Sequence, residues 1–112
     1  MTTKDFKFYY KYLMKNFGHA ECSGCRALAH ILLDYEPGNT MFAYYTKYAN
    51  EIGSTPTAVE RAVRIYLKQI TKDYTIEDIS VMLDYAFKPG QTTLKAAEFI
   101  PVLKFALDNE ED

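Results

Sequence analysis

The most regular alternation of hydrophobic and polar positions lies between residues 41 and 70. Apolar side chains recur there at three- and four-residue steps in two successive segments, which predicts two amphipathic helices. On the first helix we expect one buried face, made of Phe42, Tyr45, Tyr48, Ala49 and Ile52. Gly53 suits the left-handed residue that ends a helix, Thr55 can cap the next helix, and Pro56 suits its first position. The pattern therefore predicts two helices joined by a tight turn.

The second of these helices, about residues 56–70, carries one continuous apolar stripe. The stripe consists of Val59, Ala62, Val63, Tyr66, Leu67 and Ile70. Because the stripe must face a core, the opposite face is expected to be exposed, and it consists of Thr57, Ala58, Glu60, Arg61, Arg64, Ile65 and Lys68. Side chains three or four positions apart stack along a helix, which places on one ridge Thr57, Arg61, Arg64 and Lys68.

A short helix, a glycine turn and a second helix with a basic ridge are the parts of a helix-turn-helix, whose second helix lies in the major groove of DNA. Arginine is the usual reader of guanine there, because its planar fork meets two acceptors on one base edge. The same spacing also fits an ordinary helix pair with a solvated basic face. Spacing and charge alone therefore leave both interpretations open.

Four further segments around this pair predict helices. We expect these helices at about residues 3–17, 23–35 and 75–87, and from Ala96 or Ala97 onward. The last start follows from Pro101, because proline is tolerated in the first turn of a helix but clashes with the preceding turn further in. The expected inward positions include Tyr10 and Ala86. At 112 residues the chain is expected to form one domain, residues 1–112, of the all-α class: a compact bundle of about six helices with a helix-turn-helix at about 41–70.

The distribution of charge changes what the net value implies. A formal net charge of −2 argues against nucleic acid as a partner, but residues 1–20 and 41–72 each carry an excess of positive charge. A phosphate backbone responds to such a local field. In the first predicted helix a basic stripe is formed by Lys4, Lys7, Lys11 and Lys15. This stripe is either a solvated face or a secondary contact to phosphates, which would position the domain without specifying sequence.

One stretch contains residue types that bind metals, namely His19, Cys22, Cys25 and His30. A structural zinc site normally needs two such pairs at the usual spacings, and a redox C-x2-C pair would be accompanied by a βαβ pattern. We therefore expect two reduced, partly buried thiols and no metal. The chain also has no glycine-rich phosphate loop, no H-E-x-x-H and no nucleophile elbow. We expect neither catalysis nor a cofactor.

Nothing in the sequence suggests a membrane protein. No apolar run approaches the length of about 20 residues that is needed to span a bilayer, and the N-terminal segment MTTKDFKF lacks the core of a signal peptide. We expect a soluble, cytoplasmic protein without a membrane partner.

The residues of the helix pair also carry a family resemblance. The segment STPTAVERAVR, residues 54–64, resembles the recognition-helix segment of the C-terminal DNA-binding effector domain of sporulation response regulators, the stage zero sporulation protein A family. Tyr45, the pair Tyr48-Ala49 and Ile52 are similar to the first helix of that family's motif. FYYKYL at residues 8–13 and EFI at residues 98–100 look like its opening and closing helices. The likeness covers most of the chain and is closest between Tyr44 and Arg64.

The resemblance implies a six-helix, all-α domain that binds a short DNA box as a transcription factor. It places Glu60, Arg61 and Arg64 on the DNA-facing helix. This chain departs from the family at Ala58, where another arginine is usual, and at Ile65, where a polar or basic residue is usual. A methyl group at either position can pack on a thymine methyl. The DNA sequence that this chain binds can therefore differ from the family's box.

The function expected from the sequence is thus sequence-specific DNA binding by a transcription regulator. We expect Arg61 and Arg64 to read bases, Thr57 and Lys68 to bind flanking phosphates, and Thr55 to belong to the same interface. The expected partner is double-stranded DNA, with a homodimer on DNA or a fuller regulator as further candidates. The alternative is a helical protein-interaction module that modulates a fuller regulator without reading DNA. The family's receiver domain has no counterpart in these 112 residues, so the chain is either a cut-out or a stand-alone regulator.

Overall fold

The computed structural model describes residues 4–109, and within this range the chain forms six α-helices and no strand. The helices are α1 (Phe6–Phe17), α2 (Ser23–Asp34), α3 (Met41–Ile52), α4 (Pro56–Asp73), α5 (Ile76–Leu83) and α6 (Ala96–Asp108). The all-α fold class predicted from the sequence is confirmed.

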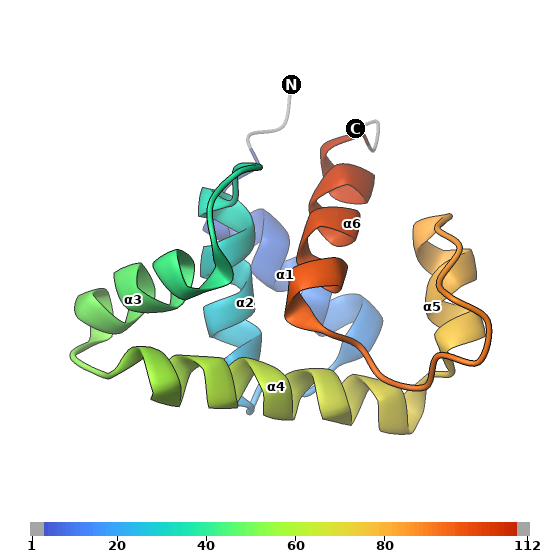
Figure 1. The fold of residues 1–112 in the computed structure, drawn as a ribbon, viewed down its shortest axis with the longest axis horizontal. Coiled ribbons are helices and arrows are strands. Elements are labelled where there is room, and N and C mark those ends of the chain that lie inside the picture. Colours follow the sequence, from blue (N-terminus) through green and yellow to red (C-terminus); the bar gives the residue numbers. More distant parts are fainter. Residues whose placement is uncertain (1–3, 110–112) are drawn as a thin grey trace.

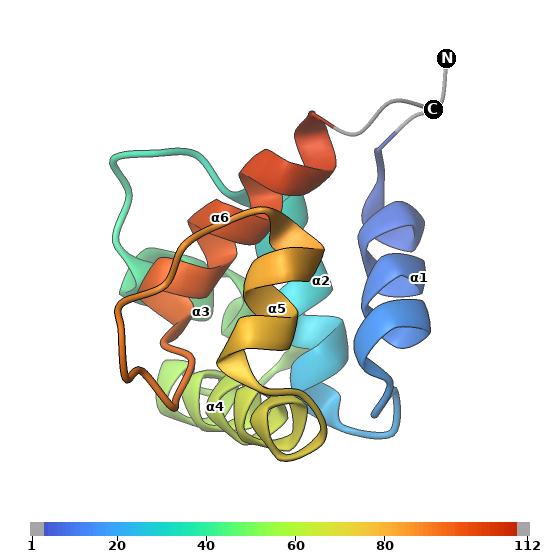
Figure 2. The same cartoon turned by 90° about the vertical axis from the view of Figure 1, so that its right-hand side faces the viewer.

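The longest helix, α4, has 18 residues and runs along one side of the molecule (Figure 1). The helices α2, α3 and α6 stand on the same side of α4, and α1 lies on the outer side of α2 (Figure 2). The short helix α5 follows the C-terminal end of α4 and packs against α6. One side of α4 is therefore covered by three helices, while its opposite side is left exposed.

The hydrophobic core joins all six helices. Its largest fully buried side chains include Tyr9, Phe17, Tyr66 and Phe99. The ring of Phe17 meets that of Phe99 edge-on at a centroid distance of 6.0 Å, which links α1 to α6. Fully burying a large apolar side chain stabilises a fold by about 1.5–3 kcal/mol relative to leaving it exposed. The apolar stripe of α4 is thus held firmly against the rest of the domain.

Gly24 sets the distance between α2 and α4. A Cβ atom built on Gly24 would lie 2.0 Å from the carbonyl oxygen of Ala62 and 2.8 Å from the Cβ atom of Tyr66. Both of these residues belong to α4, so the backbones of the two helices are nearly in contact. No side chain larger than hydrogen fits at this crossing, which therefore fixes the position of α4 on the domain.

A polar network ties the first, second and last helices together. The Nζ atom of Lys104 donates to the carbonyl oxygen of Leu32 (2.7 Å) and to the hydroxyl of Tyr9 (3.0 Å). The Tyr9 hydroxyl in turn donates to Asp108 (2.9 Å). Leu32 lies in the last turn of α2, which has no basic residue of its own. The lysine from α6 thus provides the positive charge that favours a helix C-terminus.

The first helix differs from the prediction in its start and in its buried side. It begins at Phe6 rather than at about residue 3, because the Asp5 carboxylate caps it by accepting the N–H of Phe8 (3.0 Å). The buried aromatic residue is Tyr9, which is 1% exposed, whereas Tyr10, predicted to point inward, is only half-buried. Tyr9 shares the buried side of α1 with Leu13 and Phe17, and its hydroxyl bonds to Asp108 and Lys104 of α6.

The fifth helix ends earlier than predicted, at Leu83 rather than at about residue 87. Asp84 adopts a left-handed conformation with a φ angle of 51°, and the N–H of Tyr85 bonds back to the carbonyl of Ser80 (3.1 Å). This arrangement stops the helix. Ala86 was predicted to point inward but is exposed, because it lies beyond the helix end.

The predicted start of α6 at Ala96 is confirmed, although the reason given for it is wrong in detail. Pro101 lies in the second turn of α6 and not in the first. The Lys95 carbonyl accepts the N–H groups of Glu98 (3.0 Å) and Phe99 (2.8 Å), so the first turn is complete before the proline is reached. Pro101 therefore removes one hydrogen bond from the interior of the helix.

The third helix buries most of the predicted face but not its ends. As predicted, the buried residues include Tyr45, Tyr48 and Ala49. Phe42 and Ile52 were also expected to be buried, yet they are 65% and 54% exposed. They lie in the first and last turns of α3, whereas Tyr44 is buried in their place and bonds through its hydroxyl to the segment that precedes the helix.

Candidate nucleic-acid interface

The connection between α3 and α4 is a tight turn with hydrogen bonds on both sides. Gly53 ends α3 in a left-handed conformation (φ 69°, ψ 36°), and the N–H of Ser54 donates to the carbonyl of Ala49 (2.9 Å). The hydroxyl of Thr55 accepts the N–H of Ala58 (3.2 Å) and so caps α4. The predicted turn chemistry is thus confirmed. A helix, a three-residue turn and a longer helix are compatible with a helix-turn-helix motif.

The two faces of α4 are as the periodicity predicts. Its buried side consists of Val59, Val63, Tyr66, Leu67 and Ile70, and Ala62 is half-buried beside them. Its other side carries the exposed residues Thr57, Ala58, Arg61, Arg64, Ile65 and Lys68, together with the half-buried Glu60. The candidate residues predicted on α4 therefore lie together on one surface, which we call the α4 face.

Glu60 and Arg64 form an ion pair one turn apart on the α4 face. The Nε atom of Arg64 lies 3.1 Å from Oε1 of Glu60. Such an exposed pair stabilises a helix by only about 0.2–0.5 kcal/mol. Its main effect is on orientation, because the carboxylate holds the Nε edge of the guanidinium and leaves the terminal nitrogens for a ligand. Within residues 4–109, neither Arg61 nor Lys68 takes part in an ion pair.

Ile65 introduces an apolar element into the α4 face. Its side chain is 43% exposed, and it follows Arg64 directly. Ala58, the other position at which the chain departs from the family pattern, is also exposed. The α4 face is therefore basic along its ridge, with methyl groups at two positions where a partner surface can contact them.

The lysines predicted to form a basic stripe on α1 do not all lie together. Three of them are exposed on the helix, namely Lys7, Lys11 and Lys15. Lys4 instead precedes the helix and donates to the carbonyl of Leu107 at the end of α6 (2.7 Å). The outer side of α1 points to a different side of the molecule from the α4 face (Figure 2). The two helices are linked at the C-terminal end of α1, where Tyr66, on the buried side of α4, donates to the carbonyl of Gly18 (3.2 Å).

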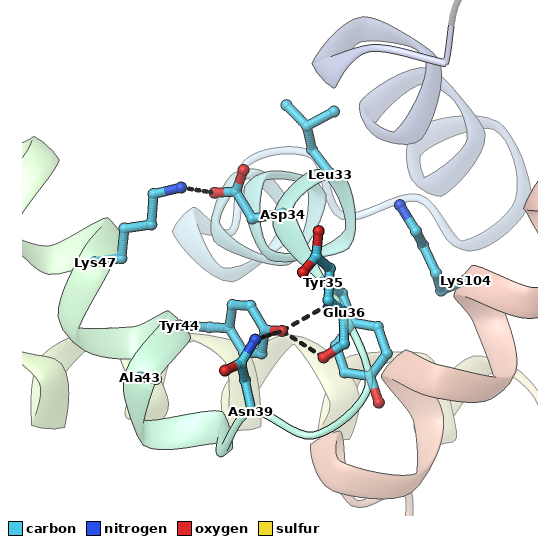
Figure 3. Close-up of a pocket in the computed structure, with 9 residues that line it drawn as sticks. All are labelled: Leu33, Asp34, Tyr35, Glu36, Asn39, Ala43, Tyr44, Lys47 and Lys104. Carbon is cyan, nitrogen blue, oxygen red and sulfur yellow. Dashed lines mark hydrogen bonds and ion pairs between the residues drawn. The ribbon is translucent and has the colours of Figure 1, made fainter.

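A hollow of about 580 Å³ lies beside the segment between α2 and α3, with Lys47, Asp34 and Tyr44 on its walls (Figure 3). Its polar groups bind one another. Lys47 lies 3.1 Å from Asp34, and the Tyr44 hydroxyl accepts the N–H of Glu36 (2.7 Å) and donates to the carbonyl of the same residue (2.8 Å). These contacts hold α3 against the end of α2, so we interpret the hollow as structural and not as a ligand site.

The cysteine and histidine residues do not converge on one point. Among the described residues, no group of three or more side chains is placed to hold a metal ion. Cys25 is buried and Cys22 is half-buried, and burial raises the pKa of both thiols. The ring of His30 packs between Phe6 and Tyr48, with centroid distances of 4.2 and 4.9 Å, and burial lowers its pKa.

His19 instead joins the segment after α1 to the end of α4. Its Nε2 atom lies 2.5 Å from Oδ2 of Asp73, and its Nδ1 atom lies 3.4 Å from Oε1 of Glu21. The hydrogen bond to Asp73 is the largest contribution that raises the pKa of His19. This contact therefore favours the protonated imidazole and fastens the C-terminal end of α4.

Two exposed lysines between α5 and α6 were absent from the predicted site. Lys88 and Lys95 lie in the segment between α5 and α6, which passes alongside the C-terminal half of α4 (Figure 1). Thr71 of α4 and Gly90 of this segment line one shared hollow. Periodicity cannot reveal such a position, because an irregular segment has no repeat and its place depends on tertiary packing. The sequence Lys88-Pro89-Gly90 indicates only that a helix has ended.

Comparisons with protein families, characterised proteins and solved structures found no match to this chain. The resemblance to the effector domain of sporulation response regulators therefore rests on the sequence segments alone and stays a prediction. Between residues 4 and 109, no helix combines the length and the apolar character that crossing a membrane requires.

Proposed function

We propose that this chain binds double-stranded DNA and acts as a sequence-specific regulator of transcription. The observation that carries the proposal is the α4 face, where a ridge of Thr57, Arg61, Arg64 and Lys68 is exposed along a helix whose other side is buried. The major groove of B-DNA is about 12 Å wide and admits an α-helix. The resemblance of residues 54–64 to the effector domain of sporulation response regulators supports the same interpretation.

In this proposal the two arginines read base edges. Each guanidinium can donate two parallel hydrogen bonds to the O6 and N7 atoms of guanine. Glu60 positions Arg64 for this purpose, since it binds the Nε atom and limits the rotation of the guanidinium. Thr57 and Lys68, at the two ends of the ridge, bind phosphates on either side of the groove. The methyl groups of Ala58 and Ile65 pack on thymine.

The way α4 is held suits this role. The crossing at Gly24 and the apolar stripe fix α4 in the free protein, so binding does not have to order the helix. Avoiding that entropic cost favours affinity. The formal net charge of −2 makes binding depend on the local field of the α4 face, which is strongest at low salt.

The test is a fluorescence-anisotropy titration of the purified chain, across a salt series, with two duplexes of equal composition. One carries the DNA box of the sporulation regulator family and the other a scrambled sequence. We expect tighter binding to the box and a steep salt dependence. The proposal fails if the chain binds neither duplex. Equal binding to both would show that the family's box is not the target. The target sequence would then be sought by selection from a randomised pool of duplexes.

Arginine substitutions test the assigned face. We expect Arg61→Ala to cost about 1–3 kcal/mol at one base position and to relax specificity there. Arg26→Ala is the matched control, because Arg26 is an exposed arginine on α2 whose guanidinium stacks on Phe6 and Tyr10 and lies off the α4 face. If the two variants bound DNA equally well, the α4 face would not be the reading surface.

The exposed apolar side chains favour a second candidate, a protein-interaction module. Phe42, Ile52 and Ile65 are 65%, 54% and 43% exposed on the two helices of the candidate motif, and exposed apolar groups are typical of a docking surface. Ile65→Lys separates the two functions. On a DNA-binding face the added charge strengthens binding to the scrambled duplex and steepens the salt slope by about one unit, while loss of the thymine contact lowers the preference for the box. On a protein-docking face it leaves DNA binding unchanged and weakens the partner complex.

A further inference from the structure

We infer that the segment between α5 and α6 forms a second contact with DNA, in which Lys88 and Lys95 bind phosphates of the strand that flanks α4. This inference rests on the proposed function, because it adds a second element to the same interface. The element was not predicted from the sequence, which placed secondary phosphate contacts on the lysines of α1.

The segment that carries these lysines is held rigidly by its own hydrogen bonds. The carbonyl of Lys88 accepts the N–H of Gln91 (3.1 Å), and Oε1 of the same glutamine accepts the N–H of Lys88 (3.3 Å). Gly90 adopts the left-handed conformation that such a turn needs, with a φ angle of 80°. The Nε2 atom of Gln91 donates to the carbonyl of Thr93 (2.8 Å). These bonds fix the backbone of Lys88, and Lys95 is held at the N-cap of α6, where its carbonyl accepts the N–H groups of Glu98 and Phe99. A backbone that is ordered before binding lowers the entropic cost of binding.

The charges of the two lysines are available to an external anion. Among the described residues neither Lys88 nor Lys95 forms an ion pair. Both line an open hollow of about 500 Å³ together with Glu98. The Glu98 carboxylate already accepts hydrogen bonds from Gln91 (3.0 Å) and Tyr85 (3.3 Å). The hollow thus contains the charges of two lysines and of one carboxylate that is already hydrogen-bonded, so its net charge is positive.

The location of the segment matches that of a DNA strand. A helix in the major groove has a phosphate backbone on either side of it. Gly90 and Gln91 line a second hollow together with Thr71 of α4, so the segment directly flanks the C-terminal half of that helix. Glu77 also lines this second hollow and opposes an anion there. We therefore assign the phosphates to the first hollow, which Lys88 and Lys95 line.

The basic stripe of α1 is less well placed for the same role. The helix that carries it lies on a different side of the molecule from α4 and comes close to α4 at its C-terminal end, where Tyr66 donates to the carbonyl of Gly18 (Figure 2). The stripe thus provides a comparison at equal change in net charge. One variant is Lys88→Gln/Lys95→Gln, called the loop variant, and the other is Lys7→Gln/Lys11→Gln, called the stripe variant.

The experiment measures binding of the wild type and both variants to the box duplex and the scrambled duplex by fluorescence anisotropy across the salt series. Each phosphate contact contributes about 0.9 to the slope of log K against log salt on B-DNA, so the loop variant should lower this slope by about 1.8. The decrease should be the same on both duplexes, because phosphates carry no sequence information. Thermal melting followed by circular dichroism verifies that both variants are folded.

The inference is supported if the loop variant lowers the slope by more than the stripe variant, and it is overturned if the decrease is equal or smaller. Arg61→Ala distinguishes this failure from failure of the proposed function. If Arg61→Ala weakens binding while the loop variant does not, only the second contact is wrong. If the wild type binds neither duplex, the proposed function and this inference fall together.

Discussion

Gly24→Ala tests whether the position of α4 depends on a backbone contact with α2. Intrinsic propensity predicts that the substitution stabilises the protein, because alanine is favoured over glycine in a helix by about 1 kcal/mol. The structure predicts the opposite sign. The new Cβ atom would lie 2.0 Å from the carbonyl oxygen of Ala62 and 2.7 Å from its carbonyl carbon. These are backbone atoms, so no side chain can rotate away and the two helices must separate.

The magnitude follows from these two effects. Overpacking a well-packed interior costs about 1–3 kcal/mol, and a clash between backbones lies at the upper end of that range. Subtracting the gain in helix propensity leaves a loss of about 2 kcal/mol in the free energy of unfolding. For a chain of this length the loss corresponds to a decrease of about 8 °C in the melting temperature.

The measurement is urea unfolding followed by circular dichroism at the helical minimum. Ser23→Ala is the matched control, because Ser23 is the neighbouring residue of α2 and is exposed. We expect the control to change stability by less than about 0.5 kcal/mol. A Gly24→Ala protein as stable as the wild type, or more stable, would refute the close crossing of α2 and α4.

Three further substitutions test other contacts. Lys68→Ala should weaken binding to all DNA sequences alike and lower the salt slope by about one unit, as measured by anisotropy; a change confined to one sequence would contradict a phosphate contact. The bond to Asp73 raises the pKa of His19 in the folded protein. This bond therefore stabilises the fold fully at a pH below about 6.5, the pKa of histidine in the unfolded chain, and the stabilisation is lost as the pH rises through the pKa of the folded protein. The stability difference between wild type and His19→Asn should therefore be larger at acidic than at alkaline pH in urea unfolding, and a pH-independent difference would contradict the bond. Lys104→Met keeps the aliphatic part of the side chain but leaves the carbonyl of Leu32 without its charged donor. The free energy of unfolding should therefore decrease by about 2 kcal/mol in urea unfolding, and unchanged stability would show that the network contributes nothing.

The sequence predicts α4 well because the difference between apolar and polar side chains repeats on every turn of the helix. Buried and exposed side chains alternate at the helical period from Val59 to Ile70, and Thr55 and Pro56 mark the start through their hydrogen-bonding chemistry. The exposure of Arg61, Arg64 and Lys68 follows from this alternation alone. The part of the candidate site that lies on one helix was therefore accessible from local pattern.

Periodicity fails where neighbouring residues are equally able to be buried or where the chain leaves the helix. Tyr9 and Tyr10 have the same side chain, and both lie at helical spacing from Leu13. The structure buries Tyr9, whose hydroxyl bonds to Asp108 of α6. Asp84 ends α5 in a left-handed conformation that asparagine or glycine would have signalled more clearly. The relation of Lys88 and Lys95 to α4 depends on how α5 and α6 pack, which no local pattern contains.

The bond from Lys4 to the carbonyl of Leu107 joins residues 103 positions apart. It brings the start of α1 and the end of α6 together at the pole of the molecule opposite α4 (Figure 1). A fluorophore attached at the start of α1 or at the end of α6 would lie at that pole. Labels for binding measurements can therefore be attached at either end while the α4 face stays free.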